Sequence, residues 1–396
     1  AATFFKQAAK EGKTLIVMDP RGQALKRHAT HMLQFKPGTD VSMLNAIMHT
    51  IVEEELFDKQ YIAAHTEGFD ELKKHLTNFS PEKMADICGI DAETLRTVAR
   101  TYATAKSSII FWGMGISQHI HGTDNARCLI DLSLMTGQIG RPGTGLHPLR
   151  GQNNVQGASD AGLVPMFFPD YQAVDKDNIR QNFERFWEAD LDPQRGLTVV
   201  EIMQDIHAEN IRGMYIMGEN PAMSDPDAQH AREGLAKLET LVVQDIFLTE
   251  TAFYADVVLP ASAWPEKDGT VTNTNRQVQM GRWALPLPGN TKQDWWIIQE
   301  IAQRMGLNWK YEHPKDVFAE MTKVMPSLKN ITWERVEKES AVIYPCDAPD
   351  QPGNEIVFSD GFPTNSGLGK MVPAQIIAPD EVPDDEYPMV LTTGRQ

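Results

Sequence analysis

Short apolar runs alternate with amphipathic segments along most of the chain. Residues 14–18 and 108–112 have the length and composition of strands that are buried on both faces. Residues 41–55 instead repeat apolar side chains at helical spacing, after a capping Thr39 or Asp40. Similar signals predict helices over 4–10, from Ser80, and over 91–105. This alternation predicts an α/β fold with a mainly parallel sheet.

The same alternation of predicted strands and helices returns after residue 198. Strands predicted over 213–217, 240–244 and 255–259 are separated by apolar-periodic helices over 199–208 and 226–238. Each of these strands closes in a polar or glycine-rich turn, and the carboxyl ends of parallel strands share one edge of the sheet. We expect that edge to accept a ligand of nucleotide size.

Glycines and prolines crowd residues 137–157, where we expect no regular structure. This stretch fits a domain crossing or a binding loop. We place a first α/β domain at 1–150 and a second at 151–290. An amphipathic helix followed by a loop-rich segment is predicted over 291–385, and the strand-like end over 386–396 is expected to start a further domain.

A strongly polar loop, Arg150-Gly-Gln-Asn-Asn-Val-Gln-Gly157, lies at the end of that glycine-rich stretch. Each carboxamide brings two donors and an acceptor, and the arginine brings a fixed fork of donors suited to a carboxylate or a phosphate. The glycines at 151 and 157 permit a close approach by the backbone. Composition alone favours a solvated surface loop, so both interpretations stand at this point.

Asp19 and Arg21 follow the first predicted strand, at the edge where open α/β sheets bind ligands. They are candidate ligand groups, although a simple Asp-Pro turn also explains them. Neither a Walker A sequence nor a GxGxxG turn from strand to helix occurs, so ordinary ATP or NAD binding is poorly supported.

Composition narrows the classes of partner. The 396 residues carry a formal net charge of −17, which disfavours nucleic acid because a phosphate backbone binds through clustered Lys and Arg. The three cysteines form no CxxC motif, and no apolar run approaches the ~20 residues that span a bilayer. We expect a cytoplasmic protein without a membrane span. The chain starts without Met inside a predicted helix and stops after a strand-like run, so we expect a piece of a longer polypeptide.

Several motifs, in collinear order over nearly the whole chain, resemble those of molybdopterin oxidoreductases. Besides the loop 150–157, they are Trp112-Gly-Met-Gly115, Leu134-Met-Thr-Gly137, Gly140-Arg-Pro-Gly143, Met217-Gly-Glu-Asn-Pro221, Gln244-Asp-Ile-Phe-Leu-Thr-Glu-Thr251 and Ala255-Asp-Val-Val-Leu-Pro260. Within that family the chain is most similar to the catalytic subunit of formate dehydrogenase, especially the cytoplasmic, NAD-dependent, multi-subunit type.

The resemblance implies two doubly wound, Rossmann-like domains, a loop-rich segment and the start of a C-terminal β-barrel domain. It also implies a bis-molybdopterin guanine dinucleotide cofactor with Mo or W, with one guanine nucleotide in each α/β domain. The positions that match one nucleotide site are Asp19, Arg21, Gly38 and Asp40. Those that match the other are Gly218, Asn220, Asp245, Thr249 and Asp294. Those that match pterin or metal contacts are Gly113, Met114, Gln118, Gly151, Gln152, Thr392, Thr393, Gly394 and Arg395.

Arg150 matches the arginine that similar formate dehydrogenases place beside the metal, and is the expected catalytic residue. A bidentate contact between its guanidinium and formate would orient the substrate. The resemblance implies release of CO2 and transfer of electrons through iron–sulfur clusters to a flavin or NAD site on partner subunits. The Cys or selenocysteine metal ligand and the [4Fe-4S] motif are absent from this sequence, so we expect the chain alone to be inactive.

Two alternatives remain at this stage. One is a non-catalytic scaffold similar to the large subunit of respiratory complex I, which keeps the fold without the molybdenum cofactor. The intact loop 150–157 and the acidic residues at the strand ends argue against it. The other is a related molybdoenzyme that acts on nitrate or another oxyanion.

Overall fold

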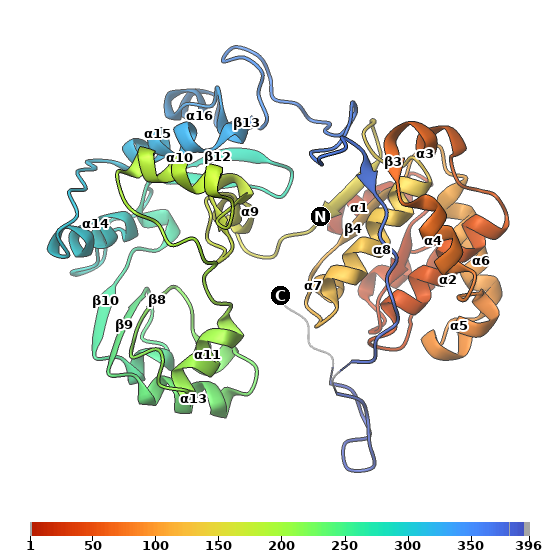
Figure 1. Cartoon of the computed structure of the whole chain (residues 1–396), viewed down its shortest axis with the longest axis horizontal. Coiled ribbons are helices and arrows are strands. Elements are labelled where there is room, and N and C mark those ends of the chain that lie inside the picture. Colours follow the sequence, from red (N-terminus) through yellow and green to blue (C-terminus); the bar gives the residue numbers. More distant parts are fainter. Residues whose placement is uncertain (1, 380, 392–396) are drawn as a thin grey trace. The chain divides into compact units, whose positions relative to one another are not determined.

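The computed structural model describes residues 2–379 and 381–391, so the predicted pterin contacts Thr392, Thr393, Gly394 and Arg395 lie outside the described residues. The chain forms two compact units (Figure 1). Unit 1 comprises residues 1–149 and 356–396, and unit 2 comprises residues 150–355. The segment 291–385 is therefore divided between the two units.

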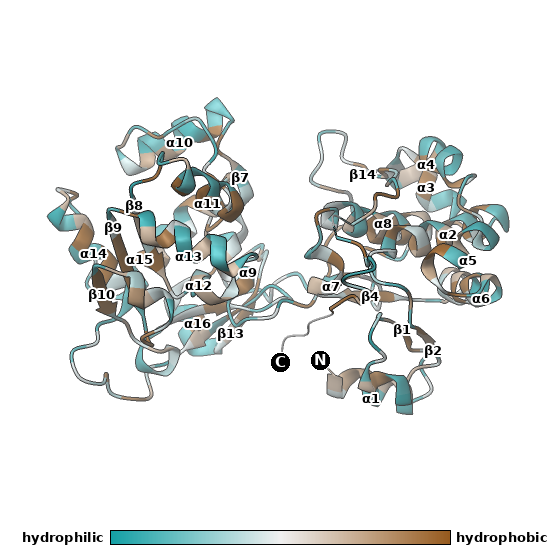
Figure 2. Cartoon of the chain, turned by 90° about the horizontal axis from the view of Figure 1, so that it is seen from below, coloured by the Kyte–Doolittle hydropathy of each residue, from teal (hydrophilic) through white to brown (hydrophobic). Residues whose placement is uncertain are grey.

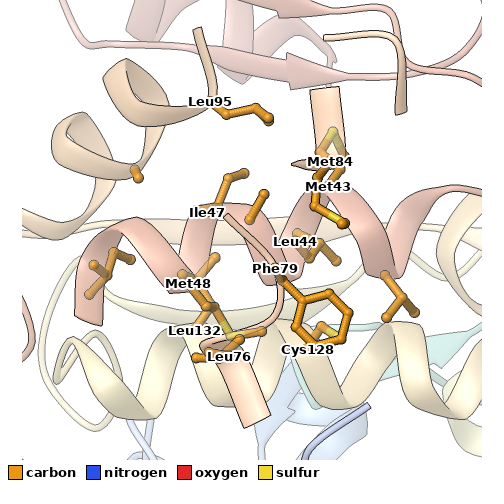
Figure 3. Close-up of a cluster of buried hydrophobic side chains, with 14 of the residues drawn as sticks. Met43, Leu44, Ile47, Met48, Leu76, Phe79, Met84, Leu95, Cys128 and Leu132 are labelled. Carbon is orange, nitrogen blue, oxygen red and sulfur yellow. The ribbon is translucent and has the colours of Figure 1, made fainter. Parts of the chain in front are cut away.

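Helix α2 is the centre of unit 1. It spans Asp40–Glu53 and buries apolar side chains on more than one face, including Met43, Leu44, Ile47 and Met48 (Figure 3). Four helices pack around it: α4 (Phe69–Leu76), α5 (Pro81–Cys88), α6 (Ala92–Ala103) and α8 (Gly122–Met135). Full burial of a Leu or Ile side chain contributes about 1.5–3 kcal/mol, so this helical core supplies much of the stability of unit 1.

The strands of unit 1 are short and pair in parallel. They are β1 (Ile16–Met18) with β2 (His31–Leu33), β4 (Ile109–Trp112) with β5 (Gly145–Pro148), and β3 (Thr66–Glu67) with β14 (Gly369–Lys370). β1 and β4 were predicted from their apolar runs, whereas β2 and β5 were not. Residues 137–157 were expected to be irregular, but strand β5 forms there. The local sequence does not predict this strand, because its hydrogen-bond partners are the backbone groups of β4.

The chain returns to unit 1 after residue 355, where β14 pairs with β3 and further hydrogen bonds involve side chains of unit 1. The backbone N–H of Val372 donates to Asp131 Oδ1 at 3.1 Å, Asn45 Nδ2 donates to the Ala374 carbonyl at 3.0 Å, and a ring nitrogen of His75 bonds the same carbonyl at 2.9 Å. Asp131 is only 1 % exposed, and burial raises the pKa of its carboxyl to about 8. Its Oδ2 is buried without a hydrogen-bond partner among the described residues.

Unit 2 contains a three-stranded parallel sheet of order β10–β9–β8. Its strands are β8 (Gly213–Met217), β9 (Thr240–Asp245) and β10 (Val257–Pro260), which are largely hydrophobic (Figure 2). Helices α11 (Val199–His207) and α13 (Ala228–Lys237) accompany it, and Ile216, Leu235, Leu241 and Val243 form the buried core. The predicted strands and helices of this block are confirmed within two residues. Their common parallel direction brings the three predicted polar turns to one edge.

A second, antiparallel sheet completes unit 2. It consists of β11 (Gly269–Thr272), β12 (Gln277–Gly281) and β13 (Ala341–Ile343), and its core includes Phe318 and Val336 of α15 (Pro314–Val324) and α16 (Trp333–Glu339). These two helices correct the expectation of a loop-rich stretch after residue 308. Pro314 occupies the first turn of α15, where a missing N–H costs nothing, and His313 and Asp316 cap the helix start.

The remaining elements are shorter or peripheral. They are α1 (Ala2–Lys10), α3 (Lys59–His65), α7 (Met114–Ser117), α9 (Val155–Asp160), β6 (Phe167–Phe168), β7 (Gln172–Ala173), α10 (Asp177–Trp187), α12 (Pro221–Ser224), α14 (Asp294–Arg304) and five 3₁₀ turns, η1 (Ala24–Arg27), η2 (Pro169–Tyr171), η3 (Thr251–Tyr254), η4 (Trp264–Glu266) and η5 (Pro326–Leu328). Among the described residues, no helix has the length and apolar character needed to cross a membrane. The α/β fold with parallel strand pairing is as predicted.

Candidate functional site

The turn after β1 carries the first pair of predicted ligand residues. Asp19 Oδ1 accepts the backbone N–H of Arg21 at 2.7 Å, and its Oδ2 accepts Gln23 Nε2 at 2.8 Å. The backbone N–H of Asp19 in turn donates to the carbonyl of Leu33 at the end of β2. The carboxylate therefore closes its own turn, while the Arg21 side chain is exposed at the strand edge. The structure of this segment is compatible with both interpretations, a simple Asp-Pro turn and a turn that offers groups to a ligand.

Gly38 and Asp40 lie at the start of α2, beyond the end of β2. Gly38 has a φ of +76°, a conformation that glycine adopts without strain, and a Cβ there would lie 3.1 Å from Pro379 Cγ. Asp40 is 4 % exposed in the first turn of α2. Burial raises the pKa of its carboxyl, and the charge of His119 acts in the opposite direction.

The β4–β5 edge positions Gly113, Met114 and Gln118. Gly113 precedes helix α7, and the Leu149 N–H donates to the Trp112 carbonyl at 2.6 Å, so both strands end at the same level. Met114 and Gln118 are exposed there. Close by in sequence, His121 Nε2 is buried without a hydrogen-bond partner among the described residues, which is unusual for a ring nitrogen and favours a polar ligand nearby.

The second predicted nucleotide edge lies at the carboxyl ends of β8–β10 in unit 2. Gly218 has a φ of +65°, and a Cβ there would meet no protein atom within 4 Å. Asn220 Oδ1 accepts both the N–H and the hydroxyl of Thr251, which fixes the turn after β8 to the turn after β9. Asp245 accepts the N–H of Phe247 with one oxygen at 3.0 Å. The Thr249 hydroxyl is buried without a partner among the described residues.

Asp294 lies at the same edge and is held by groups that the sequence did not suggest. The fully buried Gln244 donates through Nε2 to Asp294 Oδ1 at 2.8 Å and accepts from the Tyr215 hydroxyl. Lys267 Nζ bonds Asp294 Oδ2 and also the Ser262 carbonyl, and the Ser262 hydroxyl is buried without a partner among the described residues. Sequence reasoning missed Lys267, because nothing in its spacing pairs it with a residue 27 positions away.

Arg150 lies at a small pocket formed within unit 2. The cavity measures about 190 Å³ and is lined by two strips of chain, the loop from Arg150 to Gln156 and the segment from Val271 to Thr274, together with Gln279. The Arg150 side chain is exposed, and carboxamides from Gln152, Asn153 and Asn154 line the same space. Side chains of this loop thus line a concavity, which the binding-loop interpretation requires.

A buried carboxylate anchors the helix that follows this loop. Asp160, at the end of α9, accepts the Tyr344 hydroxyl at 2.6 Å and Gln156 Nε2 at 2.7 Å. Burial raises the pKa of Asp160, and the hydrogen bonds from Tyr344, Gln156 and Tyr171 oppose that shift. Gln156 also lines the pocket, so this network extends to its wall.

The cysteines offer no metal centre. Cys88, Cys128 and Cys346 are free and buried, and burial raises the pKa of the Cys88 and Cys128 thiols, which disfavours the thiolate that a metal requires. Throughout the described part of the chain, no group of three or more His, Cys, Asp or Glu is arranged to hold a metal ion.

Residues 1–304 match the model of the molybdopterin oxidoreductase family. The chain belongs to that family. It is 44 % identical over 391 residues to the F420-dependent formate dehydrogenase subunit alpha of Methanocaldococcus jannaschii, covering 98 % of this chain and 58 % of the relative. It is 38 % identical over 392 residues to formate dehydrogenase H of Escherichia coli K12, covering 98 % of this chain and 55 % of that protein.

A solved structure supports the fold. Acetylene hydratase from Pelobacter acetylenicus superimposes with a TM-score of 0.71 at 22 % identity, over 92 % of this chain and 52 % of the neighbour. The chain thus spans little more than half the length of each of these three proteins. The family and the α/β fold expected from the motifs are confirmed.

Proposed function

We propose that this chain is part of the catalytic subunit of a formate dehydrogenase, which converts formate to CO2 with release of two electrons and one proton. The observation that carries this proposal is Arg150, a permanent cation at a small pocket rich in carboxamides. Support comes from relatives at 38 % and 44 % identity that are named formate dehydrogenases. A pocket of about 190 Å³ suits a ligand of a few heavy atoms.

Arg150 is the proposed substrate residue. Its guanidinium presents two parallel N–H donors that match the two oxygens of formate, and this contact fixes the direction of the C–H bond. The same positive charge selects an anion over water in the pocket. Gln152 and Gly151, which follow Arg150, are proposed to contact the pterin, because Gly151 leaves open space where a Cβ would project.

The cofactor implied by the family is a molybdopterin with Mo or W, and we propose the bis-guanine dinucleotide form. When bound, it supplies the two-electron acceptor for formate oxidation. The residues of the β8–β10 edge fit one nucleotide: Asp245 and Asp294 can accept from guanine N–H groups, and the unpartnered hydroxyl of Thr249 offers a further contact. Asp19, Arg21, Gly38 and Asp40 are the proposed residues for the other nucleotide, and Gly113, Met114 and Gln118 those for the pterin.

The electron acceptor is proposed to lie on a partner subunit, reached through iron–sulfur clusters that include a [4Fe-4S] cluster bound outside this chain. NAD was expected from the resemblance. The relative from M. jannaschii is named F420-dependent, so F420 is the competing assignment for this part of the proposal. Assay of the complete enzyme with each acceptor in turn decides between them.

Replacement of Arg150 tests the substrate assignment. In the complete enzyme, Arg150→Ala removes two charge-assisted hydrogen bonds, and we expect kcat/KM for formate to fall by about 10²-fold. Arg150→Lys keeps the charge but loses the fork and should recover only part of the activity. Formate kinetics that are unchanged in Arg150→Ala would remove formate as the proposed substrate and would favour a different oxyanion.

Cofactor analysis tests the enzyme assignment itself. Pterin extraction and metal analysis of the complete protein should find molybdopterin and stoichiometric Mo or W. Finding neither would contradict the proposed function and would support the non-catalytic scaffold instead.

A further inference from the structure

The side chain of Asn154 attaches the loop that carries Arg150 to the facing strip of the pocket. Asn154 Oδ1 accepts the backbone N–H of Thr272 at 2.9 Å, and Thr272 ends strand β11. This bond joins the two strips of chain that line the pocket, the loop from Arg150 and the segment from Val271. The Asn154 side chain therefore sets the separation between the arginine loop and the strand that faces it.

The backbone of Asn154 is equally specific. Its φ is +66°, a left-handed conformation that Asn and Gly tolerate better than other residues, and it precedes helix α9. The Asn154 carbonyl accepts the N–H of Ala158 at 2.8 Å and so begins the helix. Asp160 holds the far end of that helix through the Tyr344 hydroxyl. The chain after Arg150 is thus fixed at both ends of α9.

Gly157 makes room for the Asn154 side chain. A Cβ at residue 157 would lie 2.1 Å from Asn154 Oδ1 and 3.2 Å from Thr272 Oγ1, and the first distance is far inside van der Waals contact. Glycine at 157 therefore lets the carboxamide of Asn154 occupy this position, and a Cβ there would displace it. Asn154 and Gly157 therefore both contribute to one hydrogen bond, from the Thr272 N–H to Asn154 Oδ1.

We propose that Asn154 is a positioning residue for Arg150, acting through its hydrogen bond to Thr272 and the space that Gly157 leaves for it. The inference deepens the proposed function and rests on it. Asn154 does not need to contact the substrate for this role. It holds the loop so that the guanidinium of Arg150 meets both oxygens of a small carboxylate at once, and small errors in such placement reduce turnover steeply.

A double-mutant cycle in the complete enzyme tests the proposal. Asn154→Gly keeps the left-handed backbone but deletes the acceptor, and Gly157→Ala displaces the acceptor without altering it. We expect each variant to raise KM for formate by about tenfold. The double variant should be no worse than either single one, because the methyl group added at position 157 has nothing to displace once the carboxamide is gone. Additive effects of the two substitutions would overturn the proposal.

Asn330→Gly is the matched control for stability. Asn330 also has a left-handed backbone, with a φ of +69°, and its Nδ2 donates to the carbonyls of Cys346 and Asp347 away from the pocket. This variant loses comparable bonds and should lower the melting temperature about as much as Asn154→Gly, while KM for formate stays unchanged. An equal rise of KM in Asn330→Gly would reduce the role of Asn154 to general stability.

Hydrogen exchange provides a measurement independent of activity. The amide of Thr272 should exchange faster in both Asn154→Gly and Gly157→Ala than in the parent enzyme and in Asn330→Gly. Unchanged exchange would show that the bond is not made. Arg150→Ala distinguishes failure of the proposed function from failure of the positioning role. If Arg150→Ala leaves formate kinetics unchanged, both are overturned. If Arg150→Ala impairs formate turnover but the Asn154 and Gly157 variants do not, only the role of Asn154 is overturned.

Discussion

The two strand edges with predicted nucleotide ligands differ in how their polar groups are satisfied. The first edge is the turn of residues 19–23 after β1, where both oxygens of Asp19 accept hydrogen bonds from the same turn. The second edge comprises the turns after β8, β9 and β10, where the hydroxyls of Thr249 and Ser262 are buried without partners among the described residues. The Asp19 carboxylate is thus satisfied within its own turn, whereas the second edge has buried hydroxyls that no described residue satisfies.

The edges also differ in what supports them. Local hydrogen bonds within five residues shape the first, and the large helical core around α2 lies in the same unit. The second is assembled from turns far apart in sequence, behind a small core that includes Leu241 and Val243. We infer that the geometry of the second edge depends more on tertiary packing and on ligand binding than that of the first.

The largest expected effect comes from a cavity behind the second edge. Leu241→Ala should lower the free energy of unfolding by about 2–5 kcal/mol and reduce the guanine nucleotide content of the purified enzyme. Leu44→Ala, which removes the same group from the core of unit 1, should cost a similar amount of stability with less loss of nucleotide. Urea unfolding and nucleotide analysis measure both; equal nucleotide loss in the two variants would abolish the distinction between the edges.

The acidic residues at the two edges provide the next test. Asp245→Asn should lower nucleotide retention by about tenfold, because an amide cannot accept from guanine N1–H and N2–H together. Asp19→Asn should have a smaller effect, since an amide oxygen can still accept the Arg21 N–H that shapes the turn. Retention is measured as guanine nucleotide released per protein after washing. A larger loss with Asp19→Asn would reverse the comparison.

The buried carboxylate of unit 1 predicts a pH effect. Asp131 has a pKa of about 8 in the folded protein, raised by burial, so the folded state keeps a proton that the unfolded chain releases above its ordinary pKa. Stability therefore falls as the pH rises from about 4 to 8, and Asp131→Asn should remove this loss. We expect a gain of several kcal/mol at pH 8, since each unit by which the pKa is raised corresponds to about 1.4 kcal/mol, and little change near pH 4, measured by urea unfolding.

Asp160 in unit 2 is the matched contrast to Asp131. Both of its oxygens accept hydrogen bonds, from Tyr344 and Gln156, so Asp160→Asn turns an NH2 group towards a donor. This variant should lose about 1–3 kcal/mol. If both variants changed the free energy of unfolding at pH 8 in the same direction, the hydrogen-bond partners of a buried carboxylate would not determine its contribution to stability.

The smallest effect concerns the unpartnered hydroxyl of the second edge. Thr249→Val keeps the shape and removes a buried polar group, so the cofactor-free protein should gain about 1 kcal/mol. The cofactor-loaded enzyme should gain nothing or lose stability if the hydroxyl contacts the nucleotide. Thermal unfolding of both forms measures the difference, and an equal gain in both would show that the ligand leaves this hydroxyl unsatisfied.

The sequence by itself determined the α/β fold, the family, and the strands and helices of the β8–β10 block. Apolar strands such as 213–217 and amphipathic helices such as 41–55 depend on local patterns, so the sequence of these segments predicts them. It did not predict β2, which is only three residues long, or α15, which lies in the stretch that was expected to be loop-rich. Short strands take their stability from partners that the local pattern does not contain.

Only the tertiary structure decided which groups work together at the site. The polar loop marked Arg150, but the partner of Asn154 is a backbone N–H 118 positions away, and Tyr344 lies 184 positions from Asp160. Lys267 meets Asp294 only because the turns after parallel strands converge at one edge. Residue type and spacing specify what chemistry a loop can perform, whereas long-range packing determines the distances at which its groups act.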